Sequence, residues 1–290
     1  MPIPLQDAQV TIVGLGLMGG SLAAALTARG ACRRIVGVAR RQETVAQALT
    51  MGVIHEGTCQ VQEGVKDADI VVLATPVLTI VKLIEEMGPW LPSDCLLTDM
   101  GSTKQAVVQA MQSLPPHVQP IGGHPMCGKE VAGLAAADAS LFQDAVYVLT
   151  PLARTSDAAI ALAQDLARVV GAQPLLLDPQ RHDMLVAAIS HLPYLLAVAL
   201  VATSESLDDN TVWQLVSTGF RDTTRLAASD ETMMLHILLS NQTAICQMLA
   251  RFQGQLAHLN SLLQSSDEAT LRAALAVAAC RRRGLFPCLR

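Results

Sequence analysis

The chain has 290 residues, 51% of them hydrophobic, so it is long enough to bury a large core in one or two domains. A formal net charge of −5 argues against a nucleic-acid partner, because such partners select proteins with basic faces. The seven cysteines include no C-x-x-C pair, which indicates neither a disulfide framework nor a zinc site, and we expect a reducing, cytoplasmic location.

The first part of the chain alternates short apolar runs with helix-like segments. The runs occupy residues 10–13, 35–38, 70–74 and 95–98, and a further run at 118–121 leads into a glycine-rich turn. Each run is nearly continuous rather than alternating, which is typical of strands that helices cover on both faces. The sequence therefore predicts an α/β domain built on a parallel sheet.

A dinucleotide-binding fingerprint follows the first predicted strand. Residues 14–19 read G-L-G-L-M-G, which fits G-x-G-x-x-G at the junction of a strand and an Ala/Leu-rich helix. The first glycine permits the turn, the second lets the backbone approach a pyrophosphate, and the third allows close helix packing. We therefore expect a Rossmann-type domain; the alternative is a glycine-rich turn in an ordinary α/β domain. The predicted cofactor-binding residues here are Gly14, Gly16, Leu17, Met18 and Gly19.

Two further strand ends bear on the cofactor. The second predicted strand ends in Ala39, Arg40 and Arg41 rather than in a carboxylate that would bind the ribose 2′-hydroxyl of NAD. Two guanidinium groups suit a 2′-phosphate, so NADP is predicted over NAD, unless both arginines are only solvated. Thr75 and Pro76 follow the strand at 70–74 and are predicted to line the same crevice.

The strongest candidate for a catalytic group is His124, within G-G-H-P-M-C-G at residues 122–128. We expect it in a turn after the strand at 118–121, as the base of a dehydrogenase. Ser102 follows another strand end; it could act in the same crevice or cap a helix at residues 103–112. Lys104 could face a ligand or be an exposed lysine of the first helical turn.

After residue 177 the strand signals stop. Asp178 and Pro179 mark the predicted boundary between a Rossmann domain, 1–177, and an all-α domain, 178–290, expected to form a homodimer. The helices are expected at residues 180–204, 211–216, 231–260 and 267–280. The apolar stretch 185–202 is read as a core or interface helix rather than a membrane span. His182 and His191 are nine residues apart, so a regular helix would direct them to nearly opposite faces.

Five linked motifs resemble those of the prephenate and arogenate dehydrogenase family of tyrosine biosynthesis. They are G-L-G-L-M-G-G-S at 14–21, D-M-G-S-T-K at 99–104, G-G-H-P-M-C-G at 122–128, I-S-H-L-P at 189–193 and G-F-R-D-T-T-R at 219–225. The resemblance implies that a 4-hydroxycyclohexadienyl ring is oxidised by hydride transfer to a nicotinamide, with loss of carbon dioxide. The length then suggests a monofunctional enzyme.

The resemblance also implies roles for single residues. It makes His124 the acceptor of the ring hydroxyl proton and Ser102 the group that orients histidine and substrate. Arg225 matches the arginine that binds a substrate carboxylate, while Arg221 is expected to pair with Asp222. His191 could line the substrate site or be an ordinary core histidine.

The sequence leaves alternatives open for both the substrate and the class of protein. T-M-M at residues 232–234 resembles NADP-dependent arogenate dehydrogenases of cyanobacterial type, which favours arogenate, with prephenate or dual use as the alternative. The β-hydroxyacid dehydrogenases need a lysine in their helical half, and this chain has none after Lys129. A non-enzymatic NADP-sensing protein is the distant alternative, since it would not need His124, Ser102 and Arg225 together.

Overall fold

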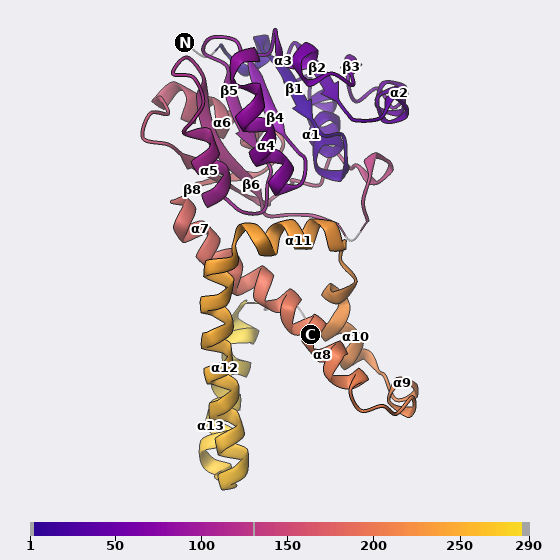
Figure 1. Cartoon of the computed structure of the whole chain (residues 1–290), viewed down its shortest axis with the longest axis vertical. Helices are drawn as coiled ribbons and strands as arrows, with labels where there is room; N and C mark the ends of the chain where they lie inside the picture. The colour runs from indigo at the N-terminus through magenta and orange to yellow at the C-terminus, as the bar shows by residue number, and fades with distance from the viewer. Residues whose placement is uncertain (1–2, 130, 286–290) are drawn as a thin grey trace. The chain divides into compact units, whose positions relative to one another are not determined.

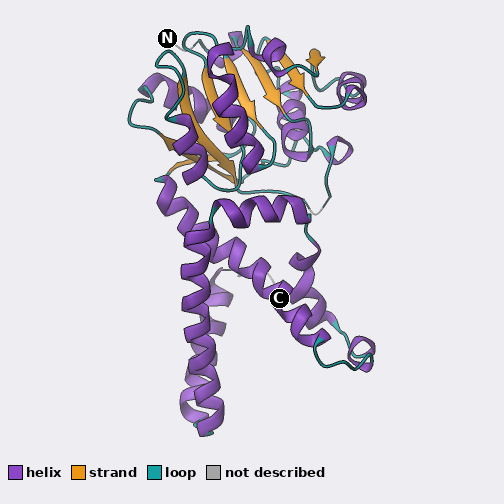
Figure 2. Cartoon of the chain, in the orientation of Figure 1, coloured by secondary structure: helices purple, strands orange, loops and turns teal. Residues whose placement is uncertain are grey.

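An eight-stranded sheet forms the first part of the molecule in the computed structural model, which describes residues 3–129 and 131–285. The strands, orange in Figure 2, lie in the order β3-β2-β1-β4-β5-β6-β7-β8. Their bounds are β1 Gln9–Val13, β2 Arg34–Val38, β3 Glu56–Thr58, β4 Ile70–Leu73, β5 Leu96–Asp99, β6 Gln119–Pro125, β7 Val146–Pro151 and β8 Gln173–Leu176.

The prediction of a Rossmann-type α/β domain is confirmed, with one difference in strand direction. β1 to β6 are parallel, whereas β7 runs antiparallel to β6 and β8 runs parallel to β7. The strand order reverses direction between β1 and β4, which opens a crevice at the carboxyl ends of these two strands. That crevice is where folds of this kind bind a dinucleotide.

Helices cover both faces of the sheet (Figure 1). Along β4, Ile70 and Val72 belong to one apolar cluster and Val71 and Leu73 to another, which explains the continuous apolar run in the sequence. The helices of this part are α1 Leu17–Ala28, α2 Gln42–Thr50, α3 Val61–Val65, α4 Val77–Met87, α5 Gln105–Met111 and α6 Asp157–Val169.

The region after residue 178 is helical, as predicted. The predicted boundary at 177 falls between β8 and α7, while the compact units of the chain are residues 1–242 and 243–290. The first unit thus includes α7 to α11, and the second holds most of α12 and α13, with a turn at Ser266 between them. The bounds are α7 Pro179–Val186, α8 Leu192–Glu205, α9 Thr211–Gln214, α10 Thr218–Thr224, α11 Glu231–Ser240, α12 Gln242–Ser265 and α13 Glu268–Leu285.

The long helical run Pro179–Glu205 contains a five-residue π-helical turn, Ala187–His191, between α7 and α8. Pro193 has no N–H to donate to the carbonyl four residues earlier, and a wider turn is a common way to absorb such a loss. By length and apolar composition alone this run could cross a membrane. In the structure its first half carries the buried polar side chains of His182, Asp183 and His191.

Two expected helices have different limits. The segment predicted as one helix at 231–260 is divided at Asn241, whose side chain is bound inside the first unit. The helix predicted to begin at Thr103 begins at Gln105 instead.

The close packing of α1 against β1 leads to a first prediction. A Cβ added to Gly19 would lie 1.9 Å from the carbonyl oxygen of Gly14, whereas one added to Gly16 would meet nothing within 4 Å. Gly19→Ala should therefore lower the free energy of unfolding by about 2 kcal/mol or more, because backbone must move. Gly16→Ala is the matched control and should change it by less than about 1 kcal/mol. Denaturant midpoints measure both, and equal midpoints would contradict the packing described here.

Candidate active site

The turn between β1 and α1 has the geometry that a dinucleotide phosphate needs. Gly14 has a φ of 106°, and its N–H donates to the carbonyl of Val38 at 2.9 Å. α1 begins immediately after Gly16, and no side chain in the described part of the chain caps its first amides. Those amides and the positive end of the helix dipole are available to an anion.

Thr75 and Pro76 lie beside this turn, at the carboxyl end of β4. A Cβ built on Gly14 would lie 2.8 Å from the Thr75 methyl carbon, so the two segments touch. The Thr75 hydroxyl oxygen is buried and has no hydrogen-bond partner among the described residues. An unpaired buried hydroxyl beside a phosphate-binding turn fits a polar group of a bound dinucleotide.

Arg40 and Arg41 are exposed at the carboxyl end of β2. Arg41 is the residue before the first turn of α2, and its side chain does not cap that helix. Both side chains are therefore at the same end of the sheet as the turn at Gly14.

His124 lies inside strand β6, so the prediction of a turn after residue 121 is wrong. β6 continues to Pro125 because β7 pairs with it antiparallel, with His124 opposite Val148. Glycine is required at position 123, where a Cβ would lie 2.4 Å from the carbonyl oxygen of Asp99. The close approach of β6 to the end of β5 fixes the backbone next to His124 at the carboxyl end of β5.

A buried ion pair lies directly beneath this strand. Lys104 and Asp99 are fully buried and in contact through the lysine ammonium and one carboxylate oxygen. The Asp99 carboxylate also accepts the N–H groups of Gly101 at 2.7 Å and Gly123 at 2.9 Å. Burial lowers the pKa of Lys104, and Asp99 opposes that shift. Lys104 is thus neither exposed nor directed at solvent, and it pairs with the carboxylate that binds the loop after β5 and the strand residue before His124.

His124 is joined to two residues of α7. Its Nδ1 lies 2.9 Å from Nε2 of His182, with the rings edge to face, and Nδ1 of His182 lies 2.8 Å from a carboxylate oxygen of Asp183. The same carboxylate accepts the backbone N–H groups of Lys104 at 2.7 Å and Gln105 at 2.9 Å. Sequence reasoning missed Asp183. The available signal was a charged side chain within the predicted helix, five residues after Asp178, the residue that caps α7.

His191 joins the same group from the π-helical turn. Its Nδ1 lies 3.2 Å from the side-chain nitrogen of Asn241, which also donates to the carbonyl of Asp183 at 2.8 Å. The wider turn alters the helical phase between positions 182 and 191, and Asn241 links His191 to the backbone of Asp183, next to His182. We call His124, His182, Asp183, His191 and Asn241 the histidine cluster.

Exposure differs sharply within the histidine cluster. The side chains from the helical region are 0–3% exposed, whereas His124 is only partly buried. Burial lowers the pKa of His124 well below its ordinary value, and positive charge on His182, Lys104 or His191 lowers it further. Burial also lowers the pKa of His191 to about 4, against the opposing effect of Asp183. Both rings are therefore neutral at cellular pH, and His124 is the one that a ligand can reach.

Ser102 is partly buried in the loop that joins β5 to α5. Ser102 does not cap α5. Asp183 binds the first amides of that helix, which begins three residues after the serine. Among described residues the hydroxyl has no protein partner, so it remains available to a ligand or to His124. Thr103 next to it is bound to Ser240 at 2.8 Å.

Arg225 lies at the end of α10, where the following 3₁₀ turn Arg225–Ala228 packs against α8. Its side chain is exposed, and it is not a member of the histidine cluster. The predicted pairing of Arg221 with Asp222 is confirmed, at 3.3 Å on the surface.

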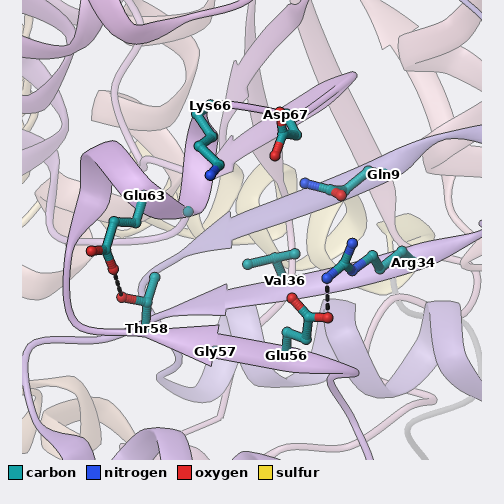
Figure 3. A pocket seen from close by; sticks show the side chains of 10 residues that line it. Gln9, Arg34, Val36, Glu56, Gly57, Thr58, Glu63, Lys66 and Asp67 are labelled. Carbon is teal, nitrogen blue, oxygen red and sulfur yellow. Dashed lines mark hydrogen bonds and ion pairs between the residues drawn. The ribbon is translucent and has the colours of Figure 1, made fainter.

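A separate cavity of about 370 Å³ lies over the β1–β3 edge of the sheet (Figure 3). Within it Arg34 pairs with Glu56, and the Thr58 hydroxyl donates to Glu63. It is lined from the beginning of β1 and β2 rather than from their carboxyl ends, so it is distinct from the crevice beside His124. The described cysteines carry free thiols, and Cys288 lies outside the described residues.

Comparison with known proteins gives concordant findings. The family model described as prephenate dehydrogenase, nucleotide-binding domain, matches residues 22–176, and that of its dimerization domain matches residues 178–277. Prephenate dehydrogenase of Bacillus subtilis is 35% identical over 266 residues, covering 90% of this chain and 72% of that protein.

Two solved structures resemble the chain over nearly its whole length. That of prephenate dehydrogenase from Aquifex aeolicus, in complex with hydroxyphenyl propionate and NAD+, has a TM-score of 0.90 at 30% identity and covers 96% of this chain and 98% of that one. Synechocystis arogenate dehydrogenase has a TM-score of 0.82 at 29% identity and covers 96% and 100%.

The buried neutral state of His191 predicts how stability depends on pH. Its pKa of about 4 in the folded chain lies below the value of about 6.5 expected after unfolding, so protons bind the unfolded chain first. Its contribution is complete above pH 6.5 and should fall by about 1.4 kcal/mol per pH unit between 6.5 and 4.

Denaturant unfolding of the wild type and His191→Gln across this range measures the effect. The variant lacks this titration, so the stability gap between the two proteins should narrow as the pH falls. Parallel curves would contradict a neutral buried His191.

Proposed function

Because the chain belongs to the prephenate dehydrogenase family and is therefore an oxidoreductase, we propose that it converts arogenate to tyrosine by oxidative decarboxylation, with NADP as the hydride acceptor. The observation that carries this is a partly exposed, neutral histidine on β6, held by buried groups at the crevice that also contains the phosphate-binding turn. A base and a dinucleotide site at one crevice are what hydride removal from a hydroxylated ring requires.

The predicted site residues would have these roles in the reaction. His124 accepts the proton of the ring hydroxyl, and Ser102, three residues beyond Asp99, orients that hydroxyl. Arg225, which is exposed, binds a carboxylate of the substrate, because a guanidinium group is suited to binding a carboxylate. His191 is 1% exposed and bound to Asn241, so it would support the substrate site without contacting the substrate.

NADP would bind along the crevice from the turn at Gly14, Gly16 and Gly19 to the loop at Thr75 and Pro76. When bound, it supplies the nicotinamide that accepts the hydride. The amides of Leu17 and Met18 at the start of α1 fit its pyrophosphate. The buried, unpaired hydroxyl of Thr75 fits one of its polar groups.

The choice of NADP rests on the end of β2. Arg40 and Arg41 are both exposed there, and Ala39 before them is buried and apolar. A carboxylate at this place would repel a 2′-phosphate, whereas guanidinium groups bind it through charge-assisted hydrogen bonds. NAD is the weaker candidate.

The choice of arogenate rests on T-M-M at residues 232–234, together with the arginine pair, and on likeness to the Synechocystis arogenate dehydrogenase. Prephenate is the second candidate, because the relative from Bacillus subtilis, 35% identical, bears the name prephenate dehydrogenase. The two substrates differ in one amino or keto group, which a single hydrogen bond can discriminate.

Initial rates of cofactor reduction test the proposal, with arogenate and prephenate each combined with NADP and NAD. The highest kcat/KM is expected for arogenate with NADP. Replacing Arg40 and Arg41 together by glutamine should raise the KM for NADP and leave that for NAD nearly unchanged. Faster reduction of NAD in the wild type would overturn the cofactor choice, and faster oxidation of prephenate would favour the second candidate.

The helical region would pair with a second copy of the chain. Most of the large exposed apolar side chains lie after residue 178, and only 22% of the most apolar stretch of Pro179–Glu205 is buried. Exposed apolar surface of this extent needs a cover, and the matching family model is described as a dimerization domain. Light scattering should give twice the chain mass of 30.7 kDa, whereas the mass of a single chain would contradict the dimer.

A further inference from the structure

The proposed reaction assigns a role to His124 but none to two buried polar residues of α7. His182 is 1% exposed and Asp183 is fully buried, and together they connect His124 to the first turn of α5. Burying a carboxylate and an imidazole is costly unless every polar atom is bound. Both are fully used here, and the one open end of the hydrogen-bonded chain is the ring of His124.

The partners determine where the protons lie. An ionised carboxylate can only accept hydrogen bonds, so the contact of Asp183 with Nδ1 of His182 requires a proton on that nitrogen. A neutral His182 then has a bare Nε2. That atom can only accept, so Nδ1 of His124, at 2.9 Å, must carry the proton. The neutral ring of His124 is left with a bare Nε2, which has the lone pair needed by a base.

We propose that Asp183 and His182 are positioning residues that fix His124 in the tautomer with a bare Nε2 and share the charge that arises when it accepts a proton. The inference rests on the proposed role of His124 as base. In the reaction the substrate O–H bond breaks and an N–H bond forms at Nε2, while the hydride passes to the dinucleotide and carbon dioxide leaves. The proton on Nδ1 of His124 can then move to Nε2 of His182, whose opposite nitrogen faces the Asp183 carboxylate.

The titratable groups around His124 oppose its protonation, which makes the link to a carboxylate important. The titratable groups that act on His124 are His182 of α7, His191 of the π-helical turn and Lys104 of the loop after β5. All three are cations when protonated and oppose protonation of His124. Asp99 already pairs with Lys104, so Asp183 is the carboxylate linked to His124 through hydrogen bonds. A base that receives a proton in this environment needs that negative charge.

Two substitutions of the same residue separate positioning from packing. His182→Leu removes the acceptor beside Nδ1 of His124, and kcat should fall about tenfold or more. His182→Gln offers a side-chain oxygen in its place and should retain several-fold more activity than the leucine variant. Ser240→Ala is the control: it removes a hydrogen bond to Thr103 in the same buried region and should leave kcat unchanged.

The pH profile gives a readout that a packing role would not move. Activity falls on the acidic side as His124 becomes protonated. His182→Gln cuts the hydrogen-bonded link from His124 to the Asp183 carboxylate. Protonated His124 then loses its counter-charge, so the acidic limb of kcat/KM should move to lower pH. Asp183→Asn should lower kcat when it is the only substitution. Its effect should be smaller when His182→Gln is already present, because that substitution has cut the link through the imidazole.

The outcomes distinguish this inference from the proposed function. His124→Asn should lower turnover by about a hundredfold or more while dinucleotide binding persists. Near-normal turnover in that variant would overturn the role of His124 itself. If His124→Asn is inactive but the leucine and glutamine variants of His182 lose equal activity, or the acidic limb stays in place, His182 and Asp183 have only a packing role.

Discussion

The carboxylate of Asp183 holds the candidate site together. It is fully buried, a state that costs several kcal/mol unless hydrogen bonds replace the lost water. Here it accepts two backbone amides at the start of α5 and faces Nδ1 of His182. A negative charge at a helix N-terminus also interacts favourably with the helix dipole. One side chain from the helical region thus fixes the first turn of α5 and the ring next to His124.

A second buried carboxylate, that of Asp99, binds backbone amides in the same way within the sheet domain. Asp99 accepts the amides of Gly101 and Gly123 and pairs with Lys104. Since Gly123 immediately precedes His124 in β6, the backbone of the candidate base is held by Asp99 while its side chain is held through His182. Lys104 contacts both systems, because its ammonium binds Asp99 and its backbone N–H binds Asp183. Displacement of either carboxylate would therefore disturb the other.

The electrostatics of this arrangement favour a neutral base. Burial lowers the pKa of His124, and His182, Lys104 and His191 oppose its protonation, so it does not enter the reaction already protonated. The same environment would disfavour the proton that a base must receive. A hydrogen-bonded path to a buried carboxylate resolves this conflict, because it provides a counter-charge without placing an anion against the substrate carboxylates.

The sequence by itself determined the features that depend on local chain geometry. The glycine fingerprint fixed the dinucleotide turn, because each glycine meets a steric demand within one strand and one helix. The continuous apolar runs predicted the parallel strands β1, β2, β4 and β5, because burial on both faces leaves no polar alternation. The motif around His124 identified the candidate base.

Only the tertiary structure decided which distant groups meet that base. β7 lies antiparallel beside β6, so His124 is in a strand rather than a turn. The π-helical turn before Pro193 shifts the helical phase, and His191 meets Asn241, which also binds the backbone of Asp183. Asp183 caps a helix nearly 80 positions earlier in the chain. Such contacts follow from the packing of whole elements and from the need to satisfy buried charges, and neither leaves a periodic signal in the sequence.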